Sequence, residues 1–162
     1  MRYLTEETHG NIHDNGTIEI TSNSVYDSTK NPKNLVNYKD TSCSCEHCSK
    51  ERDEQEHAIV FDFKDKLIQL ESYTIKSRFS NDGSSDGWII VDRRDNDATL
   101  NGPNIIHTFE HYQKKAGFYR YVRLRQTGDS WYSYDHKTIG FPLIEFYGKL
   151  KEEIFKQKLL NY

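Results

Sequence analysis

Short segments with strand-type alternation recur between residues 17 and 147, each bounded by turn-forming or charged residues. The clearest runs from Tyr119 to Arg125, where aromatic or aliphatic side chains alternate with arginines. A period of two is typical of a half-buried strand, and about seven short strands with no helix between them favour an antiparallel sandwich or barrel. We predict the other strands at residues 17–21, 58–63, 67–77, 88–91, 105–109 and 139–147. The chain is therefore expected to be all-β, folded as an antiparallel β-sandwich.

The flanking segments depart from this pattern. Residues 1–16 are polar and rich in turn-forming residues, so we predict an N-terminal arm before a sandwich over residues 17–149. A short helix is expected to begin at Pro32 and to run through Val36. Residues 150–162 predict a C-terminal helix or the start of a linker, because apolar residues recur there at helical spacing: Leu150, Ile154, Phe155 and Leu159.

Composition and charge exclude several classes of function. The chain of 162 residues, long enough for one domain, carries 22 basic and 25 acidic residues for a net charge of -3. That balance excludes a generally basic nucleic-acid binder and gives no attraction to an anionic membrane surface. No apolar stretch approaches the roughly 20 residues of a membrane span, and the N-terminus lacks the apolar core of an export signal. We therefore expect a reduced, cytoplasmic domain or a fragment of a larger protein.

A cluster of cysteines lies in a long polar loop over residues 39–56. Such closely spaced thiolates and an imidazole could supply zinc ligands: Cys43, Cys45, His47 and Cys48. Structural zinc sites normally take two ligand pairs from separate elements, however, and only His13 and His57 could contribute from a distance. We expect no cofactor and a solvated loop with free thiols, with zinc binding as the alternative.

Several ordered segments together resemble the discoidin domain, also called the coagulation factor 5/8 type C domain, of the galactose-binding-like sandwiches. The chain is most similar to the intracellular kind attached to BTB domains, notably in protists. The segments that carry the resemblance are Ile18–Ser24, Ile59–Phe63, Tyr73–Ser77, Arg120–Gly128 and Leu143–Gly148. The resemblance implies a jelly-roll sandwich. The chain departs from the family pattern after Phe79, where most of one strand is missing, which would expose a sheet edge.

The resemblance also implies a ligand site in the loops at one end of the sandwich, corresponding here to residues 24–31, 41–57 and 78–87. Relatives bind galactose-type sugars, anionic phospholipid heads or proteins. The tips of these loops carry almost no apolar residues, so we expect no membrane insertion. The candidate ligand-binding residues are Tyr26, Arg78, Tyr132, Tyr134 and His136, because aromatic faces beside hydroxyl groups suit sugar stacking or a protein contact.

Two neighbouring features have structural interpretations. Trp131 is expected to cap the core, as in many members of the family. The arginines of the alternating strand could bind phosphate or carboxylate groups: Arg120, Arg123 and Arg125. The resemblance implies instead that they are structural and pair with acidic residues near the strand ends.

No catalytic motif stands out, since the chain has no P-loop, no Gly-x-Ser-x-Gly and no HExxH. We therefore predict a non-catalytic binding module. The leading hypothesis is protein–protein recognition through the loops at one end of the sandwich, and the alternative is carbohydrate binding. The sequence predicts no nucleic-acid partner and leaves open the oligomeric state.

Overall fold

The computed structural model describes residues 1–25, 27–38, 47–48, 57–76, 105–110, 117–125 and 140–152. In chain order the elements are helix α1 (Arg2–Thr8), strand β1 (Glu19–Ser22), the 3-10 helix η1 (Pro32–Val36), and strands β2 (His47–Cys48), β3 (Ala58–Asp62), β4 (Lys66–Lys76), β5 (Ile106–Glu110), β6 (Tyr121–Arg125), β7 (Gly140–Phe141) and β8 (Leu143–Glu152). The predicted short helix at Pro32 is confirmed.

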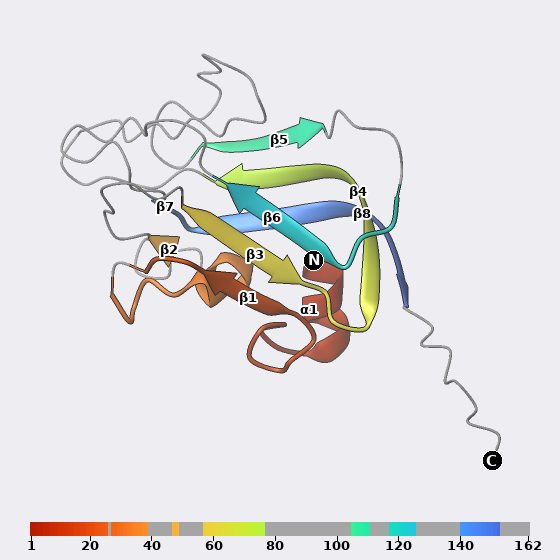
Figure 1. Cartoon of the computed structure of the whole chain (residues 1–162), viewed down its shortest axis with the longest axis horizontal. Coiled ribbons are helices and arrows are strands. Elements are labelled where there is room, and N and C mark those ends of the chain that lie inside the picture. Colours follow the sequence, from red (N-terminus) through yellow and green to blue (C-terminus); the bar gives the residue numbers. More distant parts are fainter. Residues whose placement is uncertain are drawn as a thin grey trace.

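Two three-stranded antiparallel sheets lie over one another, one in the order β1-β3-β6 and the other in the order β5-β4-β8 (Figure 1). A short antiparallel pair, β2-β7, accompanies them. Every strand pair in the described residues is antiparallel, so the predicted all-β antiparallel sandwich is confirmed.

The core lies between the two sheets and follows from the alternation of each strand. Phe61 of β3 is fully buried and lies between Ile20 and Val122 on the neighbouring strands. From the other sheet, Phe146 meets Phe61 edge to face, with ring centroids 4.9 Å apart. Such edge-to-face pairs stabilise a core by about 0.5–1.5 kcal/mol beyond the area that they bury.

A tight turn connects β3 to β4, between the strands that were predicted over residues 58–63 and 67–77. Lys64 adopts a left-handed conformation with φ of 58°, and the backbone N–H of Lys66 donates to the carbonyl of Phe63 at 2.9 Å. Close by, Ile68 and Tyr119 exchange two backbone hydrogen bonds of 2.9 Å each. This bridge joins the start of β4 to the residues that lead into β6.

The N-terminal residues differ from the predicted arm, because Arg2–Thr8 form helix α1. Leu4 and Met1 are buried, at 3% and 8% exposure, and pack into the core. A seven-residue helix is too short to form by its own propensity, so its packing against the sandwich must stabilise it. Residues 1–16 contain no amphipathic repeat from which this helix could be predicted.

The C-terminal end also differs from the prediction. Residues 150–152 were expected to begin a helix, but they continue β8, whose residues Lys149, Leu150 and Glu152 pair with β4. Pairing along β4 outweighs the helical spacing because each strand residue gains a cross-strand neighbour. The rest of the predicted helix, residues 153–162, lies outside the described residues, as does the predicted strand over 88–91 and the departure after Phe79.

Within the part of the chain that is described, no helix is long and apolar enough to cross a membrane.

Candidate functional site

The strands that border the predicted ligand loops end together at one end of the sandwich. Ser22, where β1 ends, pairs with Ile59 at the start of β3, and Ala58 pairs with Arg125 at the end of β6. In the other sheet, the last residue of β4, Lys76, pairs with the first residue of β5 and the first residue of β8. We call this the loop end, and it lies at the left in Figure 1.

The predicted ligand residues belong to segments that leave the sandwich at this loop end. Tyr26 follows β1, Arg78 follows β4, and the residues Tyr132, Tyr134 and His136 lie between β6 and β7. All five lie outside the described residues, and so does Trp131. The structure therefore brings together the strand ends from which they emerge, and their roles in binding remain predictions.

The cysteine cluster also lies mainly outside the described residues, which exclude Cys43 and Cys45. His47 and Cys48 form β2, which pairs with Phe141 and Gly140 of β7. Within residues 39–56, His47 and Cys48 thus lie beside β7, the strand that follows the predicted aromatic residues in the chain. Among the residues that are described, no group of three or more His, Cys, Asp or Glu side chains is placed to hold a metal ion.

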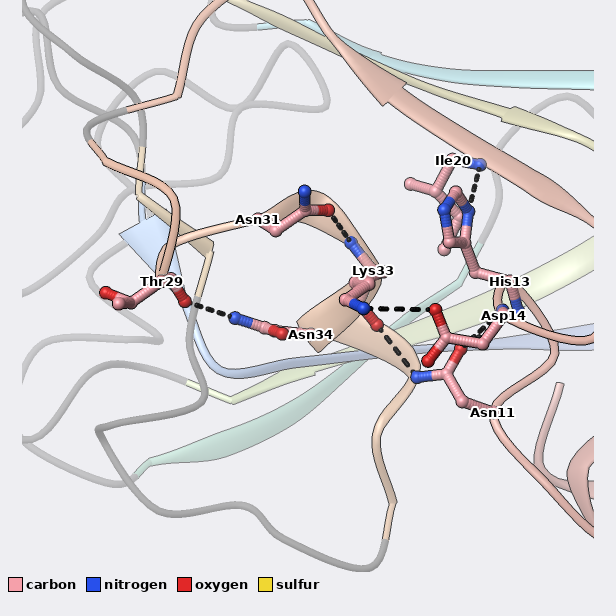
Figure 2. Close-up of polar contacts among 8 residues, drawn as sticks. All are labelled: Asn11, His13, Asp14, Ile20, Thr29, Asn31, Lys33 and Asn34. Carbon is pink, nitrogen blue, oxygen red and sulfur yellow. Dashed lines mark hydrogen bonds and ion pairs between the residues drawn. The ribbon is translucent and has the colours of Figure 1, made fainter.

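The segment from residue 27 to residue 38, next to Tyr26, is fixed by its own polar side chains (Figure 2). Asp27 accepts hydrogen bonds from the backbone N–H and the hydroxyl of Thr29, at 2.7 and 2.6 Å. These bonds to Thr29 hold the pKa of the Asp27 carboxyl below its usual range, although the group is exposed. The side-chain amide of Asn34 then donates to the carbonyl of Thr29 at 2.7 Å. These bonds set the conformation of residues 27–34 locally, whereas Leu35 and Val36, both fully buried, pack into the core.

Helix η1 anchors the same segment to the rest of the chain. Asn31 caps the helix, accepting from the backbone N–H of Lys33 at 3.0 Å. The carbonyl of Lys33 accepts from Asn11 at 3.2 Å, and its ammonium group pairs with Asp14 at 3.1 Å (Figure 2). Residues 11–16 and 27–38 thereby brace one another.

His13 connects this polar network to the first sheet. Its Nδ1 accepts a hydrogen bond from the backbone N–H of Ile20 in β1, at 3.0 Å (Figure 2). A nitrogen that accepts carries no proton, so this contact places the proton of a neutral ring on Nε2. His13 therefore acts as a structural acceptor here.

The prediction that Arg120 is structural is confirmed, because its guanidinium pairs with Asp62 at 2.7 Å. Arg123 and Arg125 lie on one face of β6, as the alternation predicted, and that face is exposed. Val122 and Leu124 point inward and pack against the core.

Sequence analysis missed the residues that hold the loop next to Tyr26, namely Asp27, Asn31 and Asn34. Two local signals could have found them. An Asp two residues before a Thr is typical of an Asx turn, and an Asn directly before a Pro is typical of a helix N-cap.

Comparisons with known proteins place this sandwich among described folds. No protein-family model matches the chain, and no curated protein matches it. Similar solved structures include a fucolectin from striped bass (Morone saxatilis) serum, with a TM-score of 0.55 and 16% identity over 82% of this chain and 47% of that one. This chain thus spans about half the length of the fucolectin chain.

Two bacterial modules resemble the chain over nearly their whole length. One is CpGH89CBM32-5 from Clostridium perfringens, in complex with GalNAc-β-1,3-galactose, with a TM-score of 0.54 and 11% identity over 82% of this chain and 96% of that one. The other is the family 32 carbohydrate-binding module of C. perfringens NanJ, in complex with galactose, with a TM-score of 0.54 and 9% identity over 84% and 95%. The chain has the galactose-binding domain-like fold. This agrees with the fold that the discoidin resemblance implied.

Proposed function

We propose that this protein is a non-catalytic carbohydrate-binding module that binds a sugar through the loop end. The observation that carries the proposal is that β1, β4 and β6, the strands that precede Tyr26, Arg78 and residues 132–136, all end at one end of the sandwich. Solved structures with the same fold include complexes with galactose and with GalNAc-β-1,3-galactose. These neighbours support the carbohydrate alternative more than the protein-recognition hypothesis that the sequence favoured first.

The chemistry of the proposed site suits a neutral sugar. The apolar face of a pyranose stacks on an aromatic ring, which Tyr132, Tyr134 or His136 would supply. Arg78 and the hydroxyl of Tyr26 would form hydrogen bonds with the sugar hydroxyls. Binding of this kind needs no metal or other cofactor, and we propose that the module works without one and acts inside the cell.

The proposal is tested by thermal unfolding of the reduced protein with galactose, GalNAc-β-1,3-galactose and fucose, with mannitol as a polyol control. A ligand present at 100 times its Kd raises the free energy of unfolding by about 2.7 kcal/mol, which gives a clear rise in Tm. The expected result is a rise with at least one sugar and none with mannitol.

Variants then locate the site. Tyr132→Ala, Tyr134→Ala and His136→Ala should each weaken sugar binding, whereas Tyr121→Ala should leave it unchanged. Tyr121 is a suitable control because it is an exposed tyrosine, at 56%, that pairs with Asp62 at the far end of β3. A rise in Tm that survives all three loop variants would contradict the proposed site, and no response to any sugar on a wider glycan array would contradict the proposed function.

A further inference from the structure

A groove runs between α1 and the last part of β8, at the end of the sandwich opposite the loop end. Its inner part has a volume of about 360 Å³ and is lined mainly by apolar side chains, including Phe63, Ile68 and Leu150. Its outer part, about 580 Å³, continues toward the turn at Asn15–Thr17. Tyr3, Leu4 and Leu150 line both parts, so the two volumes lie side by side.

The groove leaves apolar surface uncovered in the described structure. Tyr3 is 67% exposed, Tyr147 44% and Leu150 37%. Burial of apolar surface contributes about 25 cal/mol per Å², so a segment that covered these three side chains would stabilise the fold.

We propose that residues 153–162 of this chain turn back from β8 and occupy this groove with their apolar side chains. Glu152, the last residue of β8, itself lines the outer part of the groove, so the segment starts at the site that it would fill. Half of its ten residues are apolar or aromatic: Ile154, Phe155, Leu159, Leu160 and Tyr162. On a helix, Ile154, Phe155 and Leu159 share one face.

Length and charge both fit this occupant. A ten-residue helix is about 15 Å long, enough to lie along the whole of α1, whose seven residues span about 10 Å. The charged residues that line the outer part are three carboxylates and two lysines, namely Glu7, Asp65, Glu152, Lys66 and Lys151. The segment carries Lys156 and Lys158 against the single acid Glu153, so its charge complements that of the groove.

A second copy of the chain fits the groove less well. The backbone N–H and C=O of Ile68 bond to Tyr119, so those of Leu150 point away from β4. Among the described residues, this side of β8 around Leu150 is an unpaired strand edge. Pairing two copies of this edge around Leu150 would place Lys149 opposite Lys151 of the other copy, which opposes association. The segment also lacks Gly, Pro, Asn and Asp between residues 153 and 158, which disfavours a tight turn followed by an added strand.

The direct test is an NMR measurement on the full chain, which looks for contacts between the Phe155 ring protons and the methyl groups of Leu4 and Leu150. A double-mutant cycle supplies the energetic test, with Leu150→Ala and Phe155→Ala alone and together. Side chains in contact should give a coupling of at least twofold in the unfolding equilibrium constant. The matched cycle of Leu150→Ala with Gln157→Ala should be additive, because Gln157 lies away from the apolar helix face.

Contacts and coupling that do not depend on protein concentration would support the proposal. Absence of contacts from Phe155, an additive cycle, or coupling that appears only as the concentration rises would overturn it; the last result would assign the groove to a second copy. Since the groove and the loop end lie at opposite ends of the sandwich, Phe155→Ala should leave sugar binding unchanged, and the two proposals can fail separately.

Discussion

Arg120 holds both carboxylate oxygens of Asp62, with Nε donating to Oδ1 at 2.7 Å and Nη2 donating to Oδ2 at 2.9 Å. The pair ties the residue before β6 to the last residue of β3, on the outer side of the first sheet. The backbone N–H of Lys64 adds a third hydrogen bond to the same carboxylate, at 2.8 Å. One side chain on β3 thus fixes the start of β6 and the turn into β4.

Replacement of Arg120 by lysine should lower the free energy of unfolding by about 1 kcal/mol, because an ammonium group cannot make two parallel bonds to a carboxylate. Arg123→Lys is the matched control, since Arg123 is exposed on the same strand and should change stability by less than about 0.5 kcal/mol. Urea unfolding of both variants measures the difference. Equal effects would show that the two-bond geometry contributes nothing.

The same pair should make stability depend on acid pH. Hydrogen bonds from Arg120, and then from Lys64, hold the pKa of the Asp62 carboxyl below its usual range. The stabilisation is therefore present above the ordinary carboxyl pKa, about 4, and is lost as the pH falls through the lower pKa of the folded state. The stability difference between the wild type and Asp62→Asn should be largest near pH 7 and should shrink below about pH 4. A difference that stays constant from pH 7 to pH 2 would contradict this account.

Gly148→Ala should destabilise the fold by more than about 2 kcal/mol. Gly148 has a φ of 153°, and a Cβ at this position would lie 2.0 Å from the carbonyl oxygen of Gln69, beside the irregular pairing between Leu70 and Ser72. Gly10→Ala is the control, because the nearest atom to a Cβ there is 3.9 Å away. A small effect at Gly148 would mean that this end of the β4–β8 pair shifts easily, and thermal unfolding of both variants would show it.

The hydroxyl of Tyr38 should stabilise the fold at neutral pH and lose that effect in alkali, and Tyr38→Phe tests this. The hydroxyl of Tyr38 donates to the carbonyl of Ile144 at 2.9 Å, on β8. Burial, and next the Glu145 carboxylate, raise the pKa of the Tyr38 hydroxyl above its usual value. Stability from this group is thus fully present below about pH 10, the pKa of an unfolded tyrosine, and is lost as the pH rises further.

At pH 7 the Tyr38→Phe variant should be about 1 kcal/mol less stable than the wild type, through loss of one hydrogen bond. This difference in the free energy of unfolding between the variant and the wild type should become smaller above about pH 10. Denaturant unfolding between pH 7 and pH 11 measures it, and Tyr3→Phe serves as the control because Tyr3 is largely exposed. A gap that widened with pH would refute the assignment.

Asn34→Ala should loosen the segment next to Tyr26, because it removes the hydrogen bond to the Thr29 carbonyl. The expected cost is about 1 kcal/mol of stability, together with weaker sugar binding if Tyr26 contacts the ligand. Lys33→Ala should have a smaller effect, since its ion pair with Asp14 is exposed and contributes at most about 1 kcal/mol. Proteolysis rates and sugar titrations of both variants test this. Full sugar affinity in Asn34→Ala would exclude Tyr26 from the site.

Local sequence signals predicted much of the fold. Alternation placed Arg123 and Arg125 on one face of their strand, and the strands predicted over residues 58–63 and 67–77 left only a short connection around Lys64. Such signals work because neighbouring side chains on a strand point to opposite faces, so one strand alone reveals its buried side. Sequence motifs also grouped the residues whose strands meet at the loop end.

Other features could not be predicted from the sequence. Helix α1 forms because Met1 and Leu4 pack into the core, and no sequence repeat along residues 1–16 predicts that contact. Leu150 has helical spacing with Ile154, yet it lies in β8 and pairs with Ile68 of β4. The Arg120 and Asp62 pair joins residues 58 positions apart, which only the pairing of β3 with β6 brings together.

The sequence by itself determined that this chain is an antiparallel β-sandwich and where most of its described strands lie, since period and turn chemistry are local properties. Tertiary structure alone decided the ends of the sandwich: a helix at residues 2–8, a strand that continues to Glu152, and a groove between them. The reason is physical. A short polar segment has no conformation that is stable by itself. Its conformation is selected by the part of the fold that offers it buried surface or an unpaired strand edge.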